Sequence, residues 1–358
     1  MSASTEVRTL LADTAQRLFA AHVTQKTLEA ARDSGWCEPL WQELERAQLP
    51  LIGVPEAAGG AGGTLSDAAA VLRIAARHAA PVPMAETLLA GALLADAGLK
   101  APHGALTVAP DAGQQISAVK EGATWRVTGT LKRVPYARTA RHLVLLAAGH
   151  VFSFEPAHYR VTPGRNLAGE ARDEVTLKHA VARAAAPTTI TQQQLFARGA
   201  LLRAIQIGGA LERALQLACD YAGQRVQFGR KIAQFQAIQQ ELARCGGEVA
   251  AAVASALSAA GVVERLDGAA GADAALQVLL AVAAAKIRAA DAAREAVAIA
   301  HQVHGAIGVT DEYALHYVTL RALSWREEFG NEVWWATQLG RAMQQAGADA
   351  CWPALSAA

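Results

Sequence analysis

The sequence predicts a mainly α-helical protein with a small central β domain. Apolar residues recur at helical spacing at the start of the chain, and long helical patterns return from Gln192 onward. Between them, from roughly residue 104 to residue 190, short β-branched runs alternate with Gly, Pro and Asp. We therefore expect an N-terminal helical domain at residues 1–100, a β domain at 101–190 and a C-terminal helical bundle at 191–358.

The first domain is justified by helical stretches such as "EPLWQELERAQL" and "LSDAAAVLRIAARHAA", with breaks at "GVPEAAGGAGGT" and "APVP". The Gly-rich break has no preceding strand and no following Lys-Ser/Thr, so it lacks the features of a phosphate-binding loop. We expect a surface loop there.

The later elements follow from the same signals. The runs "ALTVAP", "WRVTGTL", "HLVLLAA", "HVFSFE" and "EVTL" predict short strands. Breaks near residues 224–229, 267–272, 305–310 and Gly330 divide the last part into four or five helices, which suits an up-and-down four-helix bundle.

Composition excludes several classes of function. The 33 Lys and Arg residues balance 32 Asp and Glu residues, so no strong field attracts nucleic acid or an anionic membrane. The longest uncharged run, Val249 to Val263, is shorter than the roughly 18 apolar residues of a membrane span. The acidic N-terminal stretch does not resemble a secretory signal, and we expect a cytoplasmic protein.

The cysteines are far apart in the sequence and form no C-x-x-C pair, which argues against a disulfide framework or a zinc knuckle. We expect reduced, mostly buried thiols at Cys37, Cys219, Cys245 and Cys351.

Two motifs in the last third of the chain suggest a dinucleotide site. They are "RVQFGRKIAQFQAIQQELA", which begins at Arg225, and "AHQVHGAIGVTDEYALHYVTLR", which contains Gln302. The chain resembles the acyl-CoA dehydrogenases over nearly its whole length. The resemblance rests on these two motifs, on "LPLIGVPEAAGGAGGT" in the first domain, and on the domain order, in which a helical domain is followed by a β domain and then a helical bundle. The resemblance implies that fold, FAD as cofactor, and α,β-desaturation of an acyl-CoA thioester.

The motif residues have the chemistry that FAD requires. The planar guanidinium of Arg225 can donate several hydrogen bonds to a pyrophosphate, and the Gln227 amide can donate another. The Phe228 ring can pack against the cofactor. Gly229 and Gly305 have no side chain and permit close approach of the backbone to the ligand. In the family these motifs reach the ADP half of a flavin that lies mainly in a neighbouring subunit. The resemblance therefore implies cofactor binding by Arg225, Gln227, Phe228, Gly229, Gln236, Gln302, Gly305, Ala306 and Asn331.

Each of these residues also has a structural interpretation. Arg225 could be a cation at a helix C-terminus, Phe228 a core residue, and Gln236 and Gln302 surface or capping residues. His301 and His304 stand three apart on one predicted helix. Two imidazoles without a third ligand make a poor metal site, so we predict no metal and a hydrogen-bonded helix end instead.

The catalytic base is missing from both positions that the resemblance indicates. Abstraction of the proton next to a thioester requires a Glu or Asp within hydrogen-bond reach. The usual position holds Phe329, before Gly330 and Asn331, and a second position used in the family holds Gly199. The nearby carboxylates are alternatives, although acidic residues of this kind more often form a solvated helix start: Glu327, Glu328 and Glu332.

The predicted β domain also departs from the family. Its Thr-Glu-Pro and Gly-Ser-Asp stretch is not recognisable in "LTVAPDAGQQISAVKEG". The Trp or Thr expected against the flavin ring is not present at "RVPYAR". We expect no flavin-ring contact from the β domain of this chain.

Short, divergent chains with an "IGVT-x-E…FG" ending resemble the acyl-CoA dehydrogenases of bacterial steroid catabolism, which are α2β2 heterotetramers. This implies a partner: a second, unlike subunit that supplies the base. It also implies a bulky steroid-derived acyl-CoA substrate and an electron-transfer flavoprotein as acceptor. A homomeric enzyme that uses Glu327 or Glu328, and a flavin-free structural subunit, are the alternatives.

Overall fold

The computed structural model describes residues 3–110, 116–269 and 271–347. The chain divides into two compact units, and we describe each by itself. The first comprises Met1–Val71 and Pro81–Gly199, and the second comprises Leu72–Ala80 and Ala200–Ala358. The predicted fold class, mainly helical with a small β domain, is confirmed.

The first unit begins with short helices. Helix α2 has a capping box, because the Thr24 side chain accepts from the Thr27 backbone, and it ends at Gly35 in the left-handed region. The Gly-rich stretch forms a loop packed on its own backbone: a Cβ on Gly60 would lie 2.1 Å from the Val54 carbonyl oxygen. The helices are α1 (Ala3–His22), α2 (Gln25–Ser34), α3 (Glu38–Arg46), the 3-10 helix η1 (Glu56–Ala58), α4 (Leu65–Arg77), which continues into the second unit, and α5 (Met84–Asp96).

The β domain of the first unit contains two four-stranded sheets that share a hydrophobic core, to which Val127, Phe152 and Val175 contribute. One sheet has the order β1-β4-β5-β8, with only β1 and β4 parallel, and the other is antiparallel with the order β2-β3-β7-β6. The strands are β1 (Leu106–Val108), β2 (Ser117–Glu121), β3 (Thr124–Pro135), β4 (His142–Ala147), β5 (His150–Phe154), β6 (Arg160–Thr162), β7 (Arg172–Val181) and β8 (Ala184–Pro187), with the 3-10 helix η2 (Pro156–His158) between β5 and β6.

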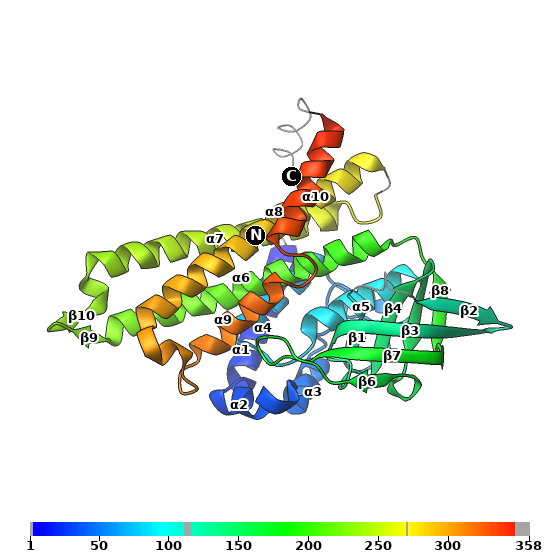
Figure 1. The fold of residues 1–358 in the computed structure, drawn as a ribbon, viewed down its shortest axis with the longest axis horizontal. Helices are drawn as coiled ribbons and strands as arrows, with labels where there is room; N and C mark the ends of the chain where they lie inside the picture. The colour runs from blue at the N-terminus through cyan, green and yellow to red at the C-terminus, as the bar shows by residue number, and fades with distance from the viewer. Residues whose placement is uncertain (1–2, 111–115, 270, 348–358) are drawn as a thin grey trace. The chain divides into compact units, whose positions relative to one another are not determined.

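The second unit is built from long helices, and Figure 1 shows a small β-hairpin at one end of them. The predicted breaks coincide with the gaps between helices. The elements are α6 (Gln192–Gln224), of which residues 200–224 belong to this unit, β9 (Val226–Gln227), β10 (Arg230–Lys231), η3 (Ile232–Gln234), α7 (Gln236–Arg265), α8 (Ala272–His304), η4 (Gly305–Val309), α9 (Leu315–Arg326) and α10 (Glu332–Ala346).

Small residues let the long helices of this unit approach closely. A Cβ on Gly208 of α6 would lie 3.1 Å from a Val253 methyl of α7. The Cys245 thiol of α7 lies 4.0 Å from the Ala296 carbonyl oxygen of α8, where many alanines are fully buried. Because alanine and glycine have little or no side chain, the helices pack almost backbone to backbone.

Helix α7 contains the uncharged run from Val249 to Val263, which the sequence analysis judged shorter than a membrane span. An 18-residue window within Gln236–Arg265 has a mean hydropathy of 1.5, enough for a membrane span by length and composition, and 33% of that window is buried. A single helix of this kind is weak evidence for a span, because helices in the cores of water-soluble proteins have the same composition.

The described cysteines are free thiols, and only one of them is buried. Burial raises the pKa of Cys245 to about 11, so this thiol stays protonated. Cys37 is half-buried and Cys219 is exposed, so the prediction of mostly buried thiols is wrong for these two. Cys351 lies outside the described residues.

Candidate functional site

The first motif forms a tight hairpin directly after α6. The Arg225 backbone N–H still donates to Tyr221 at 2.8 Å, and Gln227 then pairs with Arg230 across the hairpin. The two turn residues, Phe228 and Gly229, have φ values of 52° and 78°. Two successive positive φ values are typical of a type I′ turn, in which glycine is common and phenylalanine is rare.

The side chains of this hairpin face outward from their unit. Phe228 is 93% exposed, which excludes the core role, and its ring only meets the Phe235 ring edge-on at 6.2 Å. Arg225 and Gln227 are exposed as well, and within the described residues no carboxylate pairs with the Arg225 guanidinium. A Cβ on Gly229 would meet nothing within 4 Å, so the space beside the turn is open.

The second motif lies at the end of α8, next to the hairpin. Gln302 is exposed, and Gly305 ends the helix with a φ of 63°. His304 stacks on Tyr221 with ring centroids 4.7 Å apart. Because Tyr221 is one turn before Arg225 and His304 adjoins Gly305, this stack brings the two motifs together.

The two histidines are held as neutral, hydrogen-bonded side chains. Thr319 donates its hydroxyl to the Leu315 carbonyl, so the 2.9 Å contact between its oxygen and His301 Nε2 requires the imidazole to donate. His304 Nδ1 donates to the Ala300 carbonyl at 2.7 Å. Burial lowers the pKa of both imidazoles. Within the described part of the chain, no three His, Cys, Asp or Glu side chains form a metal site.

The position expected for the catalytic base carries a buried ring. Phe329 is 7% exposed, its ring lies 5.8 Å from the Arg203 guanidinium, and its carbonyl accepts from Trp335 Nε1 at 2.8 Å. The other expected position, Gly199, lies within α6 and has no side chain. Neither position can accept a proton.

Each of the three neighbouring carboxylates is engaged. Glu328 is nearly buried, and its Oε2 accepts from Arg203 Nε at 2.8 Å and Nη2 at 2.7 Å. Glu332 pairs with Arg326, whose hydrogen bond lowers the pKa of that carboxyl. The Glu327 side chain is 48% exposed, and its Oε2 accepts from the Asn331 side-chain amide at 3.3 Å. The prediction of a solvated acidic cluster is therefore wrong for Glu328.

Lys286 and Arg203 are the residues of this loop region that the sequence analysis missed. Lys286 is fully buried, and its ammonium donates to the carbonyls of Trp325 at 3.3 Å, Arg326 at 2.6 Å and Gly330 at 2.8 Å. Burial lowers its pKa to about 7, although Glu328 opposes this shift. The signal was a cation within apolar sequence: Arg203 in "ALLRAIQIGG" and Lys286 in "LLAVAAAKI".

The structure separates the predicted cofactor residues into two groups. Asn331, the N-cap of α10, follows the Gly330 carbonyl that binds Lys286. Lys286 and Gln302 both lie on α8. Gln302 is 16 residues beyond Lys286, which corresponds to about 24 Å along the helix axis. One pyrophosphate cannot reach both positions. Within one chain the hairpin, the start of α7 and the end of α8 therefore form one group, and Asn331 stands apart.

The stretch "RVPYAR" in the first unit serves an internal network. Tyr136 is 2% exposed and donates its hydroxyl to Glu170 at 3.4 Å. Arg172 pairs with the same carboxylate group at 3.0 Å, and both partners are almost fully buried. These side chains stabilise the β domain from within.

Two parts of the chain match known domains. Residues 5–101 match the acyl-CoA dehydrogenase N-terminal domain, and residues 188–345 match the acyl-CoA dehydrogenase C-terminal domain. The acyl-CoA dehydrogenase IpdE2 of Mycobacterium tuberculosis strain H37Rv is 33% identical over 321 residues, which cover 88% of this chain and 91% of that protein.

Two similar solved structures are complexes of two differently named chains. A variant of the Tcur3481-Tcur3483 steroid ACAD has a TM-score of 0.85 at 27% identity and covers 96% of this chain and 99% of its own. The ChsE4-ChsE5 complex from Mycobacterium tuberculosis has a TM-score of 0.83 at 25% identity, covering 97% and 99%.

Proposed function

The chain belongs to the acyl-CoA dehydrogenase family, and on that premise we propose that it is one subunit of a heteromeric, FAD-dependent enzyme. Its substrate would be a bulky steroid-derived acyl-CoA thioester, desaturated at the α,β position, with an electron-transfer flavoprotein as acceptor. The similarity to the steroid ACAD and to the ChsE4-ChsE5 complex supports both the unlike partner and the substrate class.

The observation that carries the proposal is the outward-facing hairpin. The Phe228 ring is 93% exposed and meets the Phe235 ring only edge-on, and among the described residues no carboxylate pairs with the Arg225 guanidinium, so both side chains are available to a surface from elsewhere. A composite site at a subunit interface supplies that surface. The separation of about 24 Å between Gln302 and the Asn331 loop also supports a composite site. The hairpin with Gln302, and the Asn331 loop, would then contact different parts of the subunit interface.

The residues present fit the ADP half of FAD. Arg225 can donate two parallel hydrogen bonds to a pyrophosphate, and Gln227 and Gln302 can donate from their amides. The backbone is open at Gly229 and Gly305, where a Cβ would meet nothing within 4 Å. When bound, the flavin would accept the hydride from the β carbon of the thioester.

The proton at the α carbon needs a base from outside this chain. Phe329 and Gly199 cannot take it, and the Glu328 carboxylate is held by Arg203. We therefore assign the base to the unlike subunit. The homomeric alternative has one residue in its favour, because Glu327 is the most exposed of the three carboxylates. A flavin-free subunit would not need both Arg225 and Gln302 exposed at the surface.

The test is to produce this chain alone and together with the product of its neighbouring gene, and to record flavin absorbance and mass. We expect flavin only in the complex of unlike chains. Arg225→Ala in that complex should remove most of the flavin, while Arg230→Ala, the control in the same hairpin, should retain it because its guanidinium stacks 4.1 Å over Phe235. A yellow homo-oligomer with acyl-CoA turnover would refute the composite site and make Glu327 the next residue to substitute.

A further inference from the structure

The Arg225 hairpin is exposed along its whole length, from Gln224 to Lys231. Two backbone hydrogen bonds close its base. The Arg225 N–H donates to the Tyr221 carbonyl at 2.8 Å, and the Arg225 carbonyl accepts from the Ile232 N–H at 2.9 Å. Because Arg225 is bonded directly to the end of α6, its position follows the last turn of that helix.

The last turn of α6, residues 221–224, has one large side chain that packs inward. Ala222 is fully buried but small, a Cβ on Gly223 would meet nothing within 4 Å, and Gln224 is exposed. Tyr221 is half-buried, and its ring stacks on His304 with centroids 4.7 Å apart and planes inclined by 24°. The turn is therefore held against the rest of its unit chiefly through the ring of Tyr221.

The His304 ring is a firmly fixed surface at the end of α8. It is 3% exposed, and its Nδ1 donates to the Ala300 carbonyl at 2.7 Å. A Cβ on Gly308 would lie 3.0 Å from the His304 Cβ, so η4 packs directly against this residue. Hydrogen bonding and close packing thus hold the ring in place two residues after Gln302.

A third ring, that of Tyr313, closes the set. Tyr313 lies between η4 and α9, 4.8 Å from the His304 ring at an inclination of 59°, and it meets the Tyr221 ring edge-on at 6.1 Å. Aromatic pairs with centroids about 4.5–7 Å apart attract one another beyond the gain from burial alone. Since each ring contacts the other two, the last turn of α6 cannot move away without breaking two ring contacts at once.

We propose that Tyr221 and His304 are positioning residues, which hold the Arg225 hairpin at a fixed place relative to Gln302 so that both can bind one diphosphate. The two rings act through Arg225 and Gln302. A hairpin that moves freely loses conformational entropy when a ligand fixes it, and this loss weakens binding. The inference rests on the proposed function for the identity of the ligand, whereas the hold on the hairpin is a property of this chain alone.

Hydrogen exchange of the full-length chain alone, followed by mass spectrometry of peptides that cover residues 222–235, measures this hold directly. We expect exchange in this segment to be about tenfold faster in Tyr221→Leu and in His304→Ala, because fraying of the last turn of α6 frees the N–H groups of Arg225 and Ile232. Tyr221→Phe and His304→Phe keep a ring in the stack, so their exchange should match that of the unmodified chain.

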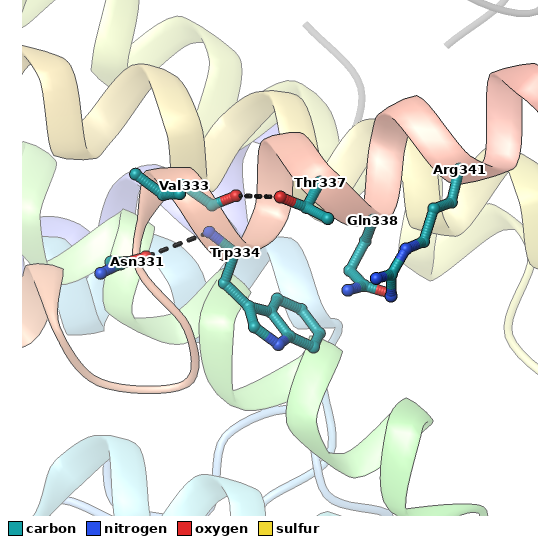
Figure 2. A pocket seen from close by; sticks show the side chains of 6 residues that line it. All are labelled: Asn331, Val333, Trp334, Thr337, Gln338 and Arg341. Carbon is teal, nitrogen blue, oxygen red and sulfur yellow. Dashed lines mark hydrogen bonds between the residues drawn. The ribbon is translucent and has the colours of Figure 1, made fainter.

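Asn331→Ala is the matched control for the exchange measurement. It removes the hydrogen bond from the Trp334 N–H to the Asn331 side chain, which Figure 2 shows at the edge of a hollow on α10, and so loosens another helix end of the same unit. Exchange in residues 222–235 should stay unchanged. Unchanged exchange in both Tyr221→Leu and His304→Ala, or an equal acceleration in Asn331→Ala, would overturn the proposal.

The FAD affinity of the complex with the unlike chain is the second readout. Tyr221→Leu and His304→Ala should bind FAD about tenfold more weakly, and the two Phe variants should restore the affinity. Leu280→Ala, which truncates a buried side chain nearer the start of α8, should leave it unchanged.

Arg225→Ala separates this proposal from the proposed function. Loss of flavin in Arg225→Ala with full affinity in Tyr221→Leu and His304→Ala would refute the positioning role and leave the proposed function intact. Retention of flavin in Arg225→Ala would refute the proposed function, and the exchange of residues 222–235 would still decide whether the rings hold the hairpin.

Discussion

Replacement of Lys286 by Met tests the most unusual charge in the structure. The Lys286 ammonium is fully buried and donates to three backbone carbonyls, those of Trp325 and Arg326 at the end of α9 and that of Gly330 in the loop before α10. Burial lowers its pKa from the ordinary 10.5 to about 7. The native state therefore binds fewer protons than the unfolded chain between these two values, and this residue makes the fold more stable as the pH rises through that window.

The size of the effect follows from the two pKa values. The penalty of protonating Lys286 in the native state is nearly constant below about pH 6 and falls by about 2 kcal/mol between pH 7 and pH 9, since one pKa unit corresponds to about 1.4 kcal/mol. Lys286→Met lacks this term. Between pH 7 and pH 9, the free energy of unfolding of the unmodified chain should therefore rise by about 2 kcal/mol more than that of the variant.

Denaturant unfolding at pH 6, 7, 8 and 9, followed by tryptophan fluorescence, measures the difference. Lys231→Met, which removes an exposed lysine of β10, is the matched control. Its free energy of unfolding should differ from that of the unmodified chain by the same amount at every pH. A difference for Lys286→Met that stays constant from pH 7 to pH 9 would refute the reasoning. It would mean that the three carbonyls keep the ammonium charged in spite of its burial.

Three further predictions concern the same unit. Glu328→Gln should lower the free energy of unfolding by about 3–5 kcal/mol, because it removes the negative charge that accepts two hydrogen bonds from the buried Arg203, whereas Glu327→Gln, on a half-exposed side chain, should cost under about 1 kcal/mol in the same denaturant titration. Asn331→Ala removes the N-cap bond of α10 and should cost about 1 kcal/mol by calorimetry, and an unchanged transition would contradict the cap. Phe228→Ser should change the stability of the isolated chain by less than about 0.5 kcal/mol, since the ring is 93% exposed, yet reduce the flavin content of the assembled protein.

Much of the fold could be predicted because its signals are local. The helix ends of the second unit coincide with Gly and polar breaks, and the predicted strand runs correspond to β1, β3, β4, β5 and β7. The strands β2, β6 and β8 were not predicted: "SAVKE" and "RVT" are polar and mostly exposed, and "AAAP" has no β-branched residue. Short edge strands of this composition take their structure from their neighbours in the sheet.

The candidate site was predictable only in part. The residue types of the hairpin indicated a ligand, but the exposure of Phe228 depends on a turn conformation that phenylalanine rarely adopts. Lys286 and Arg203 were missed because a single cation in an apolar helix is normally placed at the surface. Their burial depends on the end of α9 and the loop after it, whose carbonyls and Glu328 are contributed by residues 39 to 125 positions away along the chain.

Helix α8 connects the Lys286 loop to the Gln302 motif without interruption, and this has a consequence for how the gene can change. Each residue of a helix turns the chain by about 100°. A substitution between these two positions alters one side chain, but a one-residue insertion or deletion would rotate His304 away from Tyr221 while Lys286 kept its bonds to the end of α9 and to Gly330. Related genes that keep both groups should therefore differ in this segment by replacement of residues and keep its length fixed.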